Sequence, residues 1–266
     1  MAMIAEGATK TESTEISTLL RGRYLYAIIE GGEDGARLGL TGMDGAEVYT
    51  MGDGKFSAVV SDLPDRKVRP ERRKLAAHHE ILKRLMADRT VLPMAFGLIA
   101  DGPESVRRIL RLNAPAFADQ MERVRGKVEL GLRVSWDVPN IFEYALATHP
   151  ELAELRDEIF RGGREPSQDD KIELGRTFDQ VINDDREAHL ERVTLALKPR
   201  CAEIVNNKPR NEREVMNLAC LVDREHVKGF EAAVVEAAHA FDQHFAFDFN
   251  GPWPPHNFVE IAMRMS

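Results

Sequence analysis

The chain has 266 residues, 43% of them apolar and 30% charged, with a formal net charge of −8 and a pI near 5.6. This composition predicts one large or two small folded cores, and the acidic charge argues against nucleic acid or an anionic membrane as partner. Two cysteines are too few for a disulfide framework, and no apolar stretch reaches the roughly 18 residues that span a bilayer. We therefore expect a cytoplasmic protein that neither enters a membrane nor binds nucleic acid.

The N-terminal part of the chain predicts an α+β unit. Residues 1–20 are polar and are expected to form a flexible arm. Behind them the expected elements are a strand at 23–30, a glycine-rich stretch at 31–45 with at most one degenerate helical turn, a hairpin of strands 47–51 and 55–61, a helix at 71–88 and a strand at 90–96. The order is that of a ferredoxin-like βαββαβ fold whose first helix is reduced to at most one turn. It predicts a domain at residues 21–102.

The C-terminal part repeats this pattern behind a connecting helix at 103–126, which Pro115 is expected to bend. The expected elements are a strand at 127–136, helical material at 137–161, a long helix at 169–198, strands at 202–205 and 214–222, a helix at 223–241 and a strand at 245–250. The sequence thus predicts two tandem ferredoxin-like domains, the second at 127–266 and enlarged by a helical hairpin.

The most unusual segment follows the last expected strand. Gly251-Pro252 should end that strand, because proline cannot donate to a β-ladder. Trp253, Pro254, Pro255 and Phe258 then form a stiff aromatic segment with restricted backbone angles. We expect these residues to close the core of the second domain or to contact a partner.

The histidines do not suggest a metal site. His78 and His79 are adjacent on the expected helix, so their side chains diverge by about 100° and each flanks its apolar stripe. A packed, hydrogen-bonded histidine is the better interpretation. His239 and His244 lie near Asp242 and Asp248, but the sequence places no further ligand to close a tetrahedral site.

Other candidates for catalytic or ligand-binding residues are equally weak. Cys201 and Cys220 are in no CxxC pair and are expected to be buried thiols. The loop at 31–35 lacks the spacing and the lysine of a phosphate-binding loop. We therefore predict no catalytic residue, no metal and no cofactor, and favour a binding or assembly protein over an enzyme. An unrecognised enzyme remains an alternative.

The sharpest alternative is an RNA-binding regulator, because ferredoxin-like sheets can bind RNA. Such sheets present aromatic residues on their central strands within a basic motif. The corresponding strand at 55–60 carries one aromatic residue, Phe56. The pattern and the acidic charge both disfavour this alternative.

Two motifs are the most distinctive in the chain. The first is Val91-Leu92-Pro93-Met94-Ala95-Phe96-Gly97, preceded by a helix with His79-Glu80, and the second is the run from Gly251 to Val259. With these motifs the chain resembles the gas vesicle protein GvpF/GvpL family over about residues 22–260. Family members often have a basic residue at the position of Ala95 and an aromatic residue at that of His256, so contacts made there would differ in this chain.

The resemblance implies an accessory protein of gas vesicle formation with two α+β domains of ferredoxin-like type. It implies action on the small hydrophobic shell protein (GvpA type) together with other accessory proteins, either transiently or as a minor component of the vesicle. Pro93, Phe96, Trp253, Pro254, Pro255 and Phe258 are the candidates for partner binding or domain closure. The sequence predicts no oligomeric state.

Overall fold

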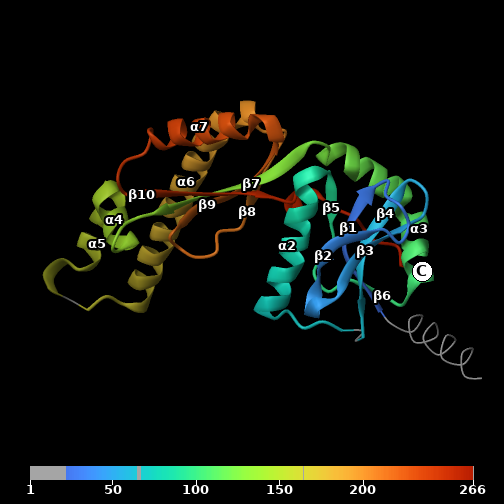
Figure 1. Cartoon of the computed structure of the whole chain (residues 1–266). Helices are drawn as coiled ribbons and strands as arrows, with labels where there is room; N and C mark the ends of the chain where they lie inside the picture. The colour runs from blue at the N-terminus through green and yellow to red at the C-terminus, as the bar shows by residue number, and fades with distance from the viewer. Residues whose placement is uncertain (1–21, 65–66, 164, 266) are drawn as a thin grey trace, which may run out of the picture. The chain divides into compact units, whose positions relative to one another are not determined.

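A computed structural model describes residues 22–64, 67–163 and 165–265 (Figure 1). The chain divides into two compact units: unit 1 is Met1–Val128 with Trp253–Ser266, and unit 2 is Glu129–Pro252. The arm expected at residues 1–20 lies outside the described residues. Both units combine helices with an antiparallel sheet, so the α+β class is confirmed.

Unit 1 is built on a sheet of strand order β2-β3-β4-β1-β5, with β6 also paired to β1. Its elements are β1 (Gly22–Glu30), β2 (Arg37–Thr41), β3 (Glu47–Gly52), β4 (Phe56–Leu63), α2 (Arg72–Asp88), β5 (Val91–Pro93), β6 (Ile99–Ala100) and α3 (Pro103–Val124). The predicted hairpin is confirmed. Gly52 pairs with Ser57, the Asp53 amide donates to the Phe56 carbonyl, and Gly54 has a φ of +87°.

Helices α2 and α3 cover opposite faces of this sheet. On β4, Ser61 hydrogen-bonds Tyr26, whose ring stacks on His78 of α2. Phe56 lies five residues before Ser61 and therefore points to the other face, where its ring meets Phe117 of α3. Central strand β1 is consequently buried on both sides, which explains its continuous run of apolar and aromatic residues.

Three details of unit 1 differ from the sequence prediction. The glycine-rich stretch contains strand β2, whose pairing with β3 is irregular between Arg37 and Thr41 around Gly39, at φ +64°. The strand expected at 90–96 is shorter, Val91–Pro93, although the Met94 amide still donates to the Tyr26 carbonyl of β1 at 2.9 Å. Helix α3 packs on β1, β3, β4 and β5, so it is part of unit 1 and not a connection between domains.

Unit 2 contains a four-stranded sheet of order β10-β7-β9-β8. Its elements are β7 (Lys127–Trp136), α4 (Ile141–Thr148), α5 (Pro150–Ile159), α6 (Gln168–Leu197), β8 (Glu203–Asn207), β9 (Glu214–Asp223), α7 (Val227–Ala238) and β10 (Phe245–Trp253). Helices α6 and α7 pack on β9 and on each other. Three helices, α4 to α6, stand where a helical hairpin was expected.

Unit 2 interrupts unit 1 in the sequence. The chain leaves unit 1 at the start of β7 and returns at the end of β10, and these two strands are neighbours in the sheet. The domain expected at 127–266 therefore ends too late, because residues from Trp253 onward make their contacts in unit 1. A boundary placed from consecutive sequence patterns cannot detect such a return.

Candidate partner-binding surface

Two buried tyrosines on β1 anchor the loops beside α2. The Tyr24 hydroxyl accepts a hydrogen bond from the Gly97 amide at 3.1 Å and lies 2.9 Å from His78 Nδ1. The Tyr26 hydroxyl accepts from the Met43 amide at 2.9 Å. Burial raises the pKa of Tyr24 to about 12, so its hydroxyl stays protonated and can donate to His78.

His78 is fixed in the middle of this arrangement. It is 1% exposed, and burial, followed by the nearby His79 and His256, lowers its pKa to about 4. The imidazole is therefore neutral at neutral pH and can accept the Tyr24 proton at Nδ1. The interpretation of His78 as a packed, hydrogen-bonded residue is confirmed.

The two motifs that resemble the GvpF/GvpL family meet at α2. The ring of Phe96, from the first motif, lies 5.8 Å from that of His78, and the ring of His256, from the second, lies 5.7 Å from that of His79. Segments about 160 positions apart thus pack against consecutive histidines. No pattern in the sequence indicates that these residues come together.

The C-terminal segment contributes to the core of unit 1. Phe258 is 0% exposed and Pro254 and Pro255 are buried, whereas Trp253 is 39% exposed. These residues were expected to close the core of the second domain. That prediction is wrong, because they belong to unit 1.

The six candidate residues fall into two groups. Pro93, Pro254, Pro255 and Phe258 are buried, which suits domain closure. Phe96 is half-buried and Trp253 exposed, so both offer apolar surface to a partner. Ala95 and His256, the positions that depart from the family pattern, are also exposed. We call Ala95, Phe96, Trp253 and His256 the motif surface.

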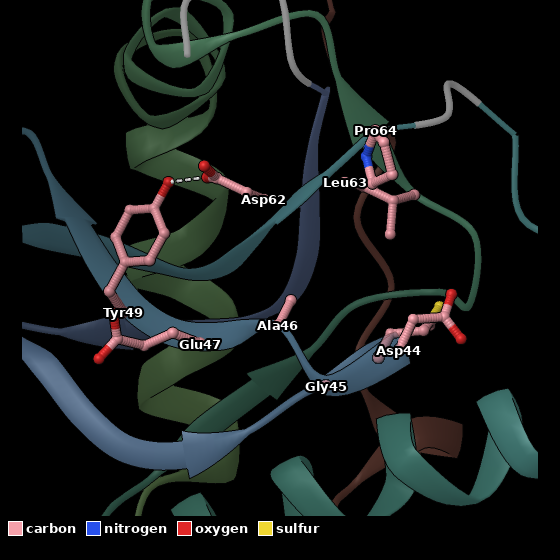
Figure 2. A pocket seen from close by; sticks show the side chains of 9 residues that line it. Asp44, Gly45, Ala46, Glu47, Tyr49, Asp62, Leu63 and Pro64 are labelled. Atoms are coloured by element: carbon pink, nitrogen blue, oxygen red, sulfur yellow. Dashed lines mark hydrogen bonds between the residues drawn. The ribbon is translucent and has the colours of Figure 1, made fainter. Parts of the chain in front are cut away.

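A cavity of about 410 Å³ opens beside the short turn Met43–Gly45, between the start of β3 and the end of β4 (Figure 2). Tyr49 donates to Asp62 at 2.6 Å on one wall, and Arg23 lies 3.3 Å from the same carboxylate. Asp44 forms a 3.0 Å ion pair with Arg73. Because these carboxylates are already paired with cations or a hydroxyl, the cavity does not resemble an acid–base centre.

Within the described residues, no group of three or more His, Cys, Asp or Glu side chains is arranged to hold a metal. Cys220 is buried and Cys201 half-buried, and neither is in a disulfide. A hydrogen bond with Cys201, followed by burial, raises the pKa of the Cys220 thiol, so it is not a reactive thiolate. Among the described helices, none is long and apolar enough to cross a membrane.

Comparison with known proteins decides the family. A model of the family described as "Gas vesicle synthesis protein GvpL/GvpF" matches residues 22–260. The chain belongs to this family. The matched range is the one over which the two motifs resembled it.

Members from distant organisms align with almost the whole chain. Gas vesicle protein F of Streptomyces sp. (strain CB03234) is 28% identical over 239 residues, covering 89% of this chain and 99% of the relative. Gas vesicle protein F2 of Halobacterium salinarum is 29% identical over 244 residues, covering 90% of this chain and 92% of the relative. The crystal structure of GvpF from Anabaena sp. PCC7120 superimposes with a TM-score of 0.80 at 25% identity, covering 91% of this chain and 99% of that one. The protein therefore has a gas-vesicle-related role.

Proposed function

We propose that this GvpL/GvpF-family protein is an assembly factor that binds the small hydrophobic shell protein of gas vesicles in the cytoplasm, together with other accessory proteins. Membership of the family over residues 22–260 carries the proposal. A shell subunit rich in apolar surface would aggregate before assembly, and a binding protein can delay this by covering that surface. The role requires no catalysis.

The motif surface is our candidate for the contact. Trp253 supplies a large apolar side chain that is 39% exposed, whereas Phe258, five residues further on, is fully buried. Tryptophan is enriched among residues that dominate binding energy at protein interfaces. Phe96 is a second, half-buried apolar side chain, and its loop is held to β1 through the Gly97–Tyr24 hydrogen bond. A partner would thus meet a fixed surface that needs little ordering.

Replacing Trp253 with alanine should weaken capture of the shell protein about thirtyfold or more, with little loss of stability, because a central aromatic residue contributes about 2 kcal/mol or more to such interfaces. The measurement is co-purification of shell protein with tagged full-length chains at several concentrations. Leu195→Ala is the matched control, since Leu195 is 72% exposed but lies on α6 of unit 2.

Equal capture by the Trp253→Ala and Leu195→Ala chains would remove the motif surface from the proposal. Loss of capture in both would point to apolar surface in general and not to this site.

We also propose that both units are variants of the ferredoxin-like fold. Unit 2 supports this through its element order β7, helices α4 to α6, β8, β9, α7, β10. In unit 1, β2 and the turn Met43–Gly45 replace the first helix.

A further inference from the structure

Strand β10 is a sheet edge without the usual protection against further pairing. Within the described residues its only neighbour in the sheet is β7. Edge strands of natural proteins are commonly short, charged or irregular, because their free backbone groups would otherwise pair with other chains. Strand β10 spans nine residues, and Asp248 is its one charged residue. Pro252 interrupts it only near its C-terminal end.

The other edges of the two sheets are shorter or interrupted. Strand β2 has five residues and is irregular around Gly39. Strands β5 and β6 have three and two residues. Strand β8 has five residues and is followed by Lys208-Pro209. Among the described strands, β10 is therefore the edge best suited to accept a further strand.

Hydrogen bonds at the end of β7 show which of its residues face β10. The Trp136 amide donates to the carbonyl of Arg213, which directly precedes β9. The Asp137 amide donates to the carbonyl of His244, which directly precedes β10. Because the direction of the backbone groups alternates along a strand, the odd-numbered residues of β7 face β10.

Side-chain contacts then orient β10 itself. Arg133 of β7 forms a 3.4 Å ion pair with Asp248. A side chain on Gly131 of β7 would meet Asn250 Oδ1 at 2.5 Å. Asp248 and Asn250 thus lie opposite odd-numbered residues of β7, so the backbone groups of the even-numbered residues of β10 face β7.

The backbone groups of Phe247 and Phe249 consequently point to the free side of β10. Their rings pack toward the helices, with Phe247 at 5.1 Å from the ring of Phe241 and Phe249 at 5.8 Å from that of Phe230. Phe230 is fully buried, whereas Phe247 and Phe249 are half-buried. A strand added here would gain backbone hydrogen bonds and cover the exposed flanks of two aromatic rings.

We propose that the shell protein binds this chain by adding an extended segment to β10 as a further strand. The inference rests on the proposed function and names how that partner is held. Free backbone groups at the spacing of a strand fit an extended chain and not a helix, whose backbone bonds are made internally. The phenylalanine rings fit a segment with apolar side chains at every second position. Pairing would also cover the backbone edge through which such a segment aggregates.

Hydrogen exchange at single amides tests the pairing. The full-length chain is measured alone and in its complex with purified shell protein. In the free chain, the amides of Phe247 and Phe249 should exchange rapidly, and those of Ala246 and Asp248 slowly because they face β7. In the complex, exchange at Phe247 and Phe249 should slow several-fold, while exchange at Ala246 and Asp248 should stay unchanged.

Phe247→Pro and Phe247→Ala form a matched pair of variants. Both remove the ring, but only proline removes the outward N–H, and an edge strand tolerates proline where its N–H faces solvent. The proline chain should capture shell protein several-fold less well than the alanine chain. Equal capture by the two chains, with Ala246 and Asp248 still slow to exchange in both, would overturn the pairing.

The exchange measurement separates this inference from the proposed function. A complex in which Phe247 and Phe249 exchange as fast as in the free chain would overturn the pairing and leave the assembly role standing. Absence of any complex would overturn both. Protection of Phe247 and Phe249 that rises with the concentration of this chain alone would identify a second copy as the occupant, and would equally overturn the pairing with shell protein.

Discussion

Phe258→Ala should lower the free energy of unfolding by about 3–5 kcal/mol, the range for truncating a fully buried aromatic residue. Phe258 is 0% exposed, so the change leaves a cavity that the prolines before it cannot fill, because their backbone angles are restricted. Urea unfolding of the full-length chain measures the loss. Trp253→Ala is the matched control and should cost about 1 kcal/mol, since its side chain is already partly in water.

Hydrogen exchange locates the effect of Phe258→Ala. Amides of β1 and β4 in unit 1 should lose protection, while those of β7 and β9 in unit 2 should keep theirs, because Phe258 belongs to unit 1. Loss of protection confined to β7 and β9 would contradict this placement and restore the boundary expected from the sequence.

Acidification from pH 6.5 to pH 4 should remove about 3 kcal/mol of stability through His78 alone. Its pKa is about 4 in the folded chain against 6.5 for the free side chain, so the unfolded state takes up a proton in this range and the folded state does not. The contribution is fully present above pH 6.5 and is lost as the pH falls towards 4. Desolvation and His79 also lower the pKa of His256, but that residue is exposed and should contribute less.

The His78→Phe chain isolates this effect. Phenylalanine keeps the ring among Tyr24, Tyr26 and Phe96 but cannot be protonated, so its stability should fall less steeply between pH 6.5 and pH 4. His239→Gln, at an exposed histidine of unit 2, should retain the wild-type slope. Identical slopes for wild type and His78→Phe would show that His78 does not control the acid response.

Local signals predicted most of the fold. The Gly52-Asp53-Gly54 turn, the apolar stripe of α2 and the alternation along β7 each fix an element within a few residues, because backbone propensity and periodicity act over short range. Strand β2 was missed because Gly39 in its middle weakens its β-propensity and its pairing depends on β3.

The candidate site was predicted only in part. The motifs at 91–97 and 251–259 supplied Phe96 and Trp253, but their meeting at His78 and His79 is a tertiary contact that no spacing reveals. Asn113 and Gln120 were missed altogether. They hold the backbone of the C-terminal segment, so no pattern of side chains in that segment points to them.

The most direct test of the proposed role is the state of the shell protein itself. Purified shell protein is diluted out of denaturant with or without an equimolar amount of this chain, and the shell protein left in the supernatant after centrifugation is measured. We expect most of it to remain in the supernatant when the chain is present, and the chain to co-elute with it. Shell protein that sediments equally with and without the chain would contradict the proposed role in assembly.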